Sequence, residues 1–341
     1  MNNFLVKRKA QLVDIITRLE EKGELKYLSV IQLKEKLITN GGNQSVFTFT
    51  ENLIADLVEA KRIGTARSYR EVLRSVKVFR NQKDLSFNEL NFDFLKKFET
   101  DYLSRGNSLG GLAVYMRTIR AICNKAIKAG SAEQEGYPFK DYTIRTGKTR
   151  KRAIPLEAIQ KIKDLNLNPK AALFNDRNIF LMSFYLRGMP YVDLAHLKVS
   201  NIIDGRIQYD RQKTAEPFDI KIPEQLSPIL KNFIKGKDKE DYVLPVIKRK
   251  GPVLQYRDIE WARSRYNRNL KQIAKMAGIE ERLTSYVSRH SYTSIADEMG
   301  IPLTAISQIL GHEKVSTTQA YLNKLRKSKL DNYQEEVIKG L

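Results

Sequence analysis

Metal-binding and cross-linking side chains are scarce in this chain of 341 residues. There is one cysteine, Cys123, so no disulfide can form within the chain, and there are only three histidines. These few side chains are scattered along the sequence, which argues against a zinc site. Cys123 itself lies in the helical pattern YMRTIRAICNKAIKAG, where a small buried residue is expected. The composition fits a reducing compartment such as the cytoplasm.

Long apolar runs and a targeting segment are also missing. No uninterrupted apolar stretch approaches the roughly 18 residues that a membrane-spanning helix requires. The first residues, MNNFLVKRKAQLVDII, become charged too early for a signal peptide. Both observations predict a protein without a membrane partner.

Basic side chains, in contrast, are abundant. Lys and Arg number 60 against 39 Asp and Glu, which gives a net charge of +21 that is spread over the whole chain. A large folded surface of this sign is typical of proteins that bind a polyanion, and nucleic acid is the leading candidate. A basic protein without such a partner is the alternative that charge alone leaves open.

The spacing of apolar residues predicts a mainly α-helical chain, and its length suits two domains. Residues 1–43 are expected to form a helical connector, and residues 44–140 a compact bundle of four to five helices. The last helix of this bundle carries basic side chains that we expect to contact a DNA backbone: Arg117, Arg120, Lys125 and Lys128. A merely solvated helix face is the general alternative.

A basic segment, KDYTIRTGKTRKRAIP, follows the bundle and is expected to be an extended linker over residues 141–153. An extended basic strand can follow a phosphate backbone, because each neutralised phosphate releases counterions. We assign four of its side chains to DNA contact: Lys148, Arg150, Lys151 and Arg152. The alternative is a linker that is only solvated.

The second domain, residues 154–325, is expected to be helical with one small β-sheet. In GRIQYDRQKTAEPFDIKIP the pattern changes to period two, which predicts a β-hairpin with Lys213 at or near its tip. Further on, Arg289 and His290 open a helix in SYVSRHSYTSIADEMG. An arginine can bind a phosphate with two hydrogen bonds, and a lysine can give a proton to a leaving oxygen.

The stretch QILGHEKVSTTQAYL places a histidine and a tyrosine at one corner. Gly311 is expected to stop a helix in the left-handed conformation, so that His312 projects from a fixed turn. Ser316 and Gln319 form an S-x-x-Q pattern, which predicts a capping box for the next helix. Tyr321 then lies inside that helix, and an activated tyrosine can act as a covalent nucleophile. A tyrosine in an amphipathic helix is, however, more often a core residue.

The span from Gly64 to Leu322 resembles the tyrosine recombinases of the phage integrase family, and especially their branch from Bacteroides-type mobile elements. The segments that carry the resemblance include RGMPYVDLAHLK, QKT, SYVSRHSYTSIADEMGIPLTAISQILGH and STTQAYL. The resemblance implies a SAM-like helical core-binding domain, followed by a mixed α+β catalytic domain with a small sheet.

The resemblance also implies a role for each matched residue. Tyr321 would attack a scissile phosphodiester and form a 3′-phosphotyrosyl bond, with Lys213 as the general acid for the leaving 5′ oxygen. Arg289 and His312 would brace the pentacoordinate phosphate. No metal or other cofactor would be needed, because the protein–DNA ester conserves the energy of the bond.

Two positions depart from the family pattern. Tyr286 stands where a histidine is usual; its hydroxyl can still bind a phosphate oxygen, but it cannot act as an imidazole base. Pro190 stands where the first catalytic arginine is expected, three residues before Asp193. We take Arg187 as its replacement, because three residues is almost one helical turn and places Arg187 about 4.5 Å away on a similar face. Its alternative role is to bind carbonyl groups at a helix end.

The implied partners are double-stranded DNA and further copies of the chain. Residues 326–341 are expected to form a tail that docks on a neighbouring protomer in a DNA-bound homotetramer, or else packs on its own domain. Accessory DNA-bending or directionality proteins are further expected partners, and the location is the bacterial cytoplasm at the nucleoid. Relatives in this branch often begin with a small β domain, so residues 1–43 are expected to be the connector of a domain that is truncated or naturally lacking.

The sequence thus predicts a site-specific recombinase that integrates, excises or inverts a mobile element. Two alternatives remain open. LTAISQILGHEKVSTTQAYL also resembles a helix-turn-helix, as in a non-catalytic DNA-binding regulator, although that reading leaves Lys213 and Arg289 without a role. A type IB topoisomerase would use the same nucleophile, but the two-domain layout and the tail favour recombination.

Overall fold

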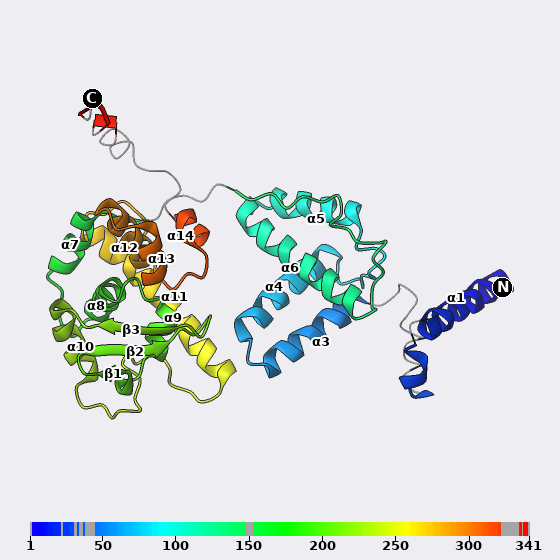
Figure 1. The fold of residues 1–341 in the computed structure, drawn as a ribbon, viewed down its shortest axis with the longest axis horizontal. Helices are drawn as coiled ribbons and strands as arrows, with labels where there is room; N and C mark the ends of the chain where they lie inside the picture. Colours follow the sequence, from blue (N-terminus) through cyan, green and yellow to red (C-terminus); the bar gives the residue numbers. More distant parts are fainter. Residues whose placement is uncertain are drawn as a thin grey trace. The chain divides into compact units, whose positions relative to one another are not determined.

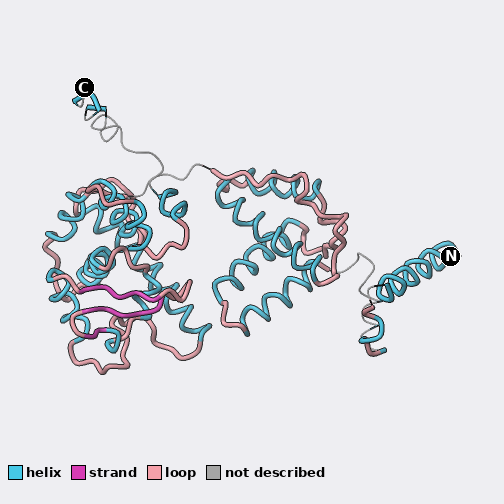
Figure 2. The backbone as a smooth tube through the Cα atoms, viewed as in Figure 1, coloured by secondary structure: helices cyan, strands magenta, loops and turns pink. Residues whose placement is uncertain are grey.

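The computed structural model describes residues 2–21, 23–30, 33, 37, 45–147, 153–321, 334–335 and 337–339. The chain divides into two compact units, Met1–Thr149 and Arg150–Leu341. Helices dominate both units, and a 3-stranded antiparallel sheet lies in the second (Figures 1 and 2). The predicted fold class, mainly α with a helical first domain and a mixed second domain, is therefore confirmed. None of the described helices is long and apolar enough to cross a bilayer.

The first unit contains a long N-terminal helix, a short 3-10 helix and a helical bundle. Their bounds are α1 Asn2–Glu21, η1 Leu25–Tyr27, α3 Val46–Glu59, α4 Ile63–Phe79, α5 Phe92–Ser104 and α6 Leu109–Lys128. Polar side chains start three of these helices, because each accepts a hydrogen bond from a backbone N–H that has no partner within the helix. These caps are Ser45, Asn91 and Ser108.

Aromatic rings hold the centre of this bundle. Phe79 meets both Phe94 and Phe98 edge-on, with 5.4 Å between ring centroids in each pair. Met116 and Cys123 of α6 are buried against the same core, which fits the small buried cysteine expected from the sequence. The thiol pKa of Cys123 is raised to about 12 by burial, so the thiol stays protonated at neutral pH.

A buried carboxylate ties the chain that follows α6 to helix α5. Glu99, 4% exposed, accepts a hydrogen bond of 2.8 Å from the Tyr142 hydroxyl and pairs with Arg145 and Lys96. Burial alone would raise the pKa of Glu99, but hydrogen bonds from Arg145, Tyr142 and Lys96 outweigh it and lower the pKa. The first residues of the predicted linker are thus packed on the helical unit. Lys148, Arg150, Lys151 and Arg152 lie outside the described residues.

The second unit packs around helix α8, in which the residues from Asn178 to Ser183 are buried. Its helices are α7 Leu156–Asp164, α8 Ala172–Tyr185, α9 Tyr191–His196, α10 Ser227–Ile234, α11 Pro252–Met276, α12 Val287–Glu298, α13 Leu303–Ile309 and α14 Val315–Tyr321, with 3-10 turns η2 Val199–Asn201 and η3 Glu224–Leu226. Phe180 and Met182 of α8 have no exposed surface. This mostly apolar segment belongs to the core, and α8 packs against α11, α12 and α7.

The sheet confirms the predicted hairpin. Its strands are β1 Ile202–Ile203, β2 Arg206–Asp210 and β3 Pro217–Lys221, in the order β1-β2-β3. Ile207 pairs with Ile220, and Tyr209 pairs with Phe218, so one face of the hairpin is apolar and packs on the core. Lys213 lies exposed in the loop that joins β2 to β3.

Replacing Glu99 by alanine should lower the free energy of unfolding by about 3 kcal/mol, because the buried Tyr142 hydroxyl and the Arg145 guanidinium lose their acceptor. Calorimetry of the intact chain measures the effect. Because the pKa of Glu99 is lowered, the stabilisation is present above the unfolded-state pKa and is lost as the pH falls through the folded-state pKa.

Glu51→Ala is the matched control. It removes an exposed ion pair of 2.6 Å with Lys77 and should cost less than about 1 kcal/mol. Equal losses in the two variants would contradict the structural role given to Glu99.

Candidate active site

The site is built around a buried arginine at the start of α12. Arg289 is 3% exposed. Its Nη1 donates a hydrogen bond of 3.2 Å to the Gly188 carbonyl, and its Nη2 donates one of 2.6 Å to the Leu310 carbonyl. The guanidinium therefore joins the end of α8, the first turn of α12 and the end of α13.

Gly188 allows this packing because it has no side chain. A Cβ at this position would lie 2.6 Å from the Cα and 2.9 Å from the Cβ of Arg289, which no L-residue tolerates. The backbone of Gly188 also has φ 71°, in the left-handed region that favours glycine. A buried hydrogen bond of 2.6 Å between the hydroxyls of Ser183 and Ser288 fastens α8 to α12 beside this contact.

His312 stands next to Arg289 on the turn between α13 and α14. Its Nε2 is 3.1 Å from Nη2 of Arg289, and its Nδ1 is 2.8 Å from the buried Thr318 hydroxyl. Because a guanidinium only donates, Nε2 must accept, and the ring proton is therefore on Nδ1. Burial, then Arg289 and Arg211, lower the pKa of His312 to about 4. The imidazole is neutral at pH 7.

Helix α14 carries the predicted nucleophile, and it is anchored to the same turn through the contact between Thr318 and His312. The helix ends at Tyr321, whose side chain lies outside the described part of the structure. The predicted capping box is wrong, because α14 begins at Val315 and Ser316 is already its second residue. The prediction of Gly311 as a left-handed helix stop is confirmed, with φ 62°.

Arg187 directly precedes Gly188, which packs against Arg289, but it does not lie one helical turn from Pro190 as predicted. Helix α8 ends at Tyr185, Arg187 has φ 58°, and Pro190 is the extended N-cap of α9, so the two positions share no helix face. The charge of Arg187 nevertheless reaches the site, because it lowers the pKa of Tyr209 against the opposing effect of burial. Within the described residues the Arg187 guanidinium has no hydrogen bond or ion pair.

Tyr286 is the N-cap residue of α12 and is 37% exposed. Its ring meets that of His290 edge-on at 5.1 Å. Its phenol therefore stands at the solvent side of the helix that holds Arg289.

Two side chains of the site were missed from the sequence. Thr318, which fixes the His312 tautomer, gave no signal. Arg211 donates to the carbonyls of Leu310 and Gly311 and is almost buried, with 10% of its side chain exposed. The sequence did contain a clue to Arg211. Side chains two residues apart in a strand share a face, so Arg211 is expected on the same buried face as Ile207 and Tyr209.

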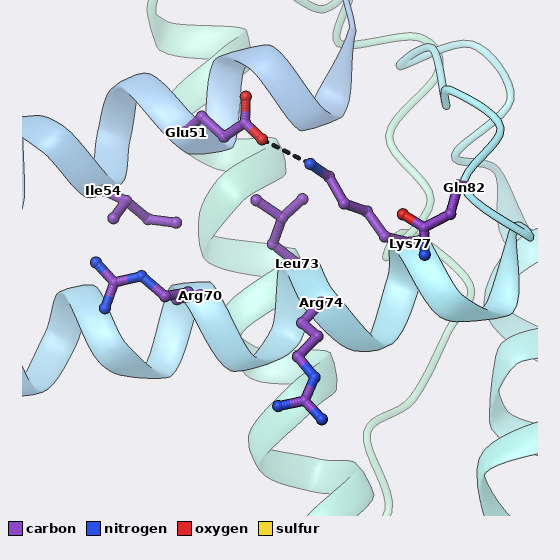
Figure 3. A pocket seen from close by; sticks show the side chains of 7 residues that line it. All are labelled: Glu51, Ile54, Arg70, Leu73, Arg74, Lys77 and Gln82. Carbon is purple, nitrogen blue, oxygen red and sulfur yellow. Dashed lines mark hydrogen bonds and ion pairs between the residues drawn. The ribbon is translucent and has the colours of Figure 1, made fainter.

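The predicted DNA-contacting residues of the first unit lie on one exposed face of α6. Arg117, Arg120 and Lys125 are exposed, whereas the opposite face of α6 packs in the core. Helix α4 carries a further basic row that was not predicted: Arg70, Arg74 and Lys77. These residues and Glu51 line an open pocket of about 320 Å³, in which Lys77 pairs with Glu51 (Figure 3).

Comparison with known proteins accounts for both units. Residues 45–144 match the phage integrase SAM-like domain, and residues 154–328 match the phage integrase family. The chain belongs to the phage integrase family. The family that the sequence resembled is thus confirmed.

Tyrosine recombinases are among its relatives. XerD of Staphylococcus haemolyticus is 25% identical over 268 residues, which cover 75% of this chain and 86% of XerD. XerA of Pyrococcus furiosus is 29% identical over 177 residues, which cover 51% of this chain but only 58% of XerA.

Solved integrases share the fold. A λ integrase dimer bound to a COC′ core site superposes with a TM-score of 0.60 at 13% identity, covering 82% of this chain and 95% of that one. The Tn1549 transposon integrase with a circular intermediate DNA gives 0.59 at 14% identity, covering 86% and 99%.

Gly188→Ala should lower the free energy of unfolding by at least about 2 kcal/mol more than Gly205→Ala. Gly205 is the matched control, because its φ of 73° is nearly the same but a Cβ there would meet nothing within 4 Å. Denaturant unfolding of both variants separates the clash with Arg289 from backbone strain. Equal losses would contradict the close packing of Gly188 against Arg289.

NMR titration of the histidine Cε1 protons should give His312 a midpoint near pH 4, with the signal assigned from a His312→Gln spectrum. The ordinary pKa of a histidine is 6.5. Between pH 6.5 and 4, His312 is therefore protonated in the unfolded chain but not in the native protein. Through this residue, stability falls as the pH is lowered across that window. A midpoint at or above 6.5 would contradict the buried, cation-flanked imidazole.

Proposed function

We propose that this chain is a site-specific DNA recombinase that cleaves and rejoins strands through a 3′-phosphotyrosyl intermediate, for integration, excision or inversion of a mobile element. The observation that carries the proposal is the pairing of Arg289 with a neutral His312 on the turn that leads into the helix of Tyr321. Family membership and the tyrosine recombinase relatives support the same chemistry.

The site concentrates positive charge where a phosphate would gain charge in the transition state. The pKa of Tyr209 is raised by burial, but Arg211, Arg289 and Arg187 each oppose that rise, so all three guanidiniums lie within electrostatic reach of one phenol. Fixed donors around a developing negative charge are usually the largest catalytic term. Arg187, without a partner among the described residues, is free to bind a phosphate oxygen in place of the missing arginine at Pro190.

The reaction balances without a cofactor. The Tyr321 oxygen attacks the phosphorus, the bond to the 5′ oxygen breaks, and Lys213 gives that oxygen its proton. The lone pair of His312 Nε2 is already engaged by Arg289, so this pair would brace the phosphate, and the proton that the phenol releases passes to solvent. The 5′ hydroxyl of another strand then attacks the phosphotyrosine and restores the tyrosine. Tyr286 can add a hydrogen bond to the phosphate from its exposed position.

The basic surfaces fit a duplex DNA partner. The α6 row (Arg117, Arg120 and Lys125), the α4 row and the linker residues Lys148, Arg150, Lys151 and Arg152 would neutralise backbone phosphates. Among the structural neighbours, λ integrase is bound to DNA as a dimer and as a tetramer. We extend this to double-stranded DNA binding and multimer formation by the present chain.

Several finer features belong to the proposal as well. The chain would act as a homotetramer joined by the tail of residues 326–341, most of which lie outside the described residues. Accessory DNA-bending or directionality proteins would assist it at the nucleoid in the bacterial cytoplasm. It would belong to the branch of Bacteroides-type mobile elements.

The two alternatives explain less of the site. A helix-turn-helix regulator has no use for a buried arginine and a neutral histidine with a fixed tautomer. A topoisomerase would share the cleavage chemistry, but the relatives and solved structures named above are recombinases and integrases.

A covalent-adduct assay tests the proposal. The protein is incubated with nicked duplexes that carry a binding site selected from a random pool, and the products are separated on a denaturing gel. The wild-type chain should become linked to DNA, and Tyr321→Phe should lose the adduct while still binding. Tyr27→Phe, at a tyrosine that is 78% exposed, is the matched control and should keep it. An adduct that survives Tyr321→Phe, or binding without any adduct in the wild type, would contradict the proposal.

A further inference from the structure

Arg211 connects the hairpin to the turn that bears His312. It is the first residue after β2, and its Nη1 donates hydrogen bonds of 3.3 Å to the Leu310 carbonyl and 3.2 Å to the Gly311 carbonyl. Two residues further along the chain is Lys213. One guanidinium thus bridges the segment of the general acid and the segment of the imidazole.

The Leu310 carbonyl is shared between two arginines. It accepts from Nη2 of Arg289 at 2.6 Å as well as from Arg211. A carbonyl oxygen has two lone pairs and can accept both donors. Through this one oxygen, the position of the hairpin is coupled to the position of Arg289.

A buried carboxylate holds Arg211 and its loop from the other side. Asp193 of α9 is 2% exposed, its Oδ1 accepts a hydrogen bond of 3.0 Å from the Gln212 backbone N–H, and its Oδ2 is 3.9 Å from Nε of Arg211. Burial raises the pKa of Asp193, while Gln212, Arg211, Arg289 and His196 oppose that rise. The two residues that directly precede Lys213, Arg211 and Gln212, are therefore both held by Asp193.

Aromatic packing also holds the β2–β3 hairpin against the turn that carries His312. A Cβ on Gly311 would lie 2.4 Å from the Phe218 ring, so the ring rests directly on the backbone of the turn. Phe218 in turn stacks on Tyr209, with 5.3 Å between centroids. The hairpin cannot shift along the turn without breaking this contact and the two hydrogen bonds of Arg211.

We propose that Arg211 is a positioning residue for strand cleavage: it holds the loop of Lys213 against the turn of His312, so that the general acid and the phosphate-binding pair are set by one guanidinium. This inference rests on the proposed recombinase function. An arginine suits the role because its Nη1 donates to two carbonyls while its Nε, at the other side of the same rigid group, faces the Asp193 carboxylate at 3.9 Å; the single ammonium of a lysine does not offer two separated nitrogens.

The test compares Arg211→Gln with Arg206→Gln. Arg206 is a matched hairpin arginine, on β2, whose ion pair with Asp219 is exposed. Cleavage is measured on ordinary DNA and on DNA with a bridging 5′ sulfur, a leaving group that needs no general acid. Arg211→Gln should slow cleavage of ordinary DNA by about 100-fold, as expected for a displaced general acid. It should recover to within about tenfold of wild type on the sulfur substrate, and Lys213→Ala should recover in the same way.

A second readout does not depend on activity. Among the described residues, the charges that act on the pKa of His312 are Arg289 of α12 and Arg211 of the hairpin loop, and both lower it in addition to burial. Arg211→Gln should therefore raise the NMR titration midpoint of His312 above that of the wild type, whereas Arg206→Gln should leave it unchanged. If Arg211→Gln does not fold, Arg211→Lys, which keeps the charge but not the fork, should show the same selective recovery with sulfur.

Three results would count against a positioning role for Arg211. Ordinary cleavage at the wild-type rate, equal slowing on both substrates, or an unmoved His312 midpoint in folded Arg211→Gln would overturn the proposal. If the wild-type chain forms no adduct at all, the recombinase function fails instead, and the His312 midpoint still reports whether Arg211 holds the turn.

Discussion

The contact between Gly188 and Arg289 is the constraint on which the rest of the site depends. Because Gly188 has no Cβ, the first turn of α12 approaches the end of α8 closely enough for the guanidinium to reach the Gly188 carbonyl. The same guanidinium then meets the Leu310 carbonyl and His312. A side chain at position 188 would separate these segments, and with them the arginine and the imidazole.

Three arginine side chains place positive charge close together in the second unit. Arg187, Arg211 and Arg289 all act on Tyr209, and the only buried carboxylate that faces them among the described residues is Asp193. Like charges held close together are costly, and an unusual φ at Arg187 adds backbone strain. A bound phosphate would relieve this repulsion, which is consistent with the proposed role of the site. Burial, followed by the charges of Arg289 and Arg211, keeps His312 neutral at pH 7.

The family could be identified from the sequence because several motif segments resemble it. Periodicity and glycine positions, which are local signals, were enough for the two-part helical fold and the hairpin. The sequence was misleading where a helix boundary mattered: Arg187 was placed on a helix that has already ended, and Ser316 was taken as a cap although α14 begins earlier. Arg211 was visible as a charge on the apolar face of a strand, yet its partners at Leu310 are about 100 residues away. Such long-range contacts have no local signature. The roles of the site residues and the linker contacts with DNA remain predictions.

The most direct measurement is mass spectrometry of the protein–DNA adduct after trimming with nuclease and protease. The chain has 16 tyrosines, so identifying the modified residue distinguishes Tyr321 from all other possible nucleophiles. The account predicts a single modified peptide, with a nucleotide joined through its 3′ phosphate to the phenol oxygen of Tyr321. A nucleotide on any other residue, or one joined through a 5′ phosphate, would contradict it.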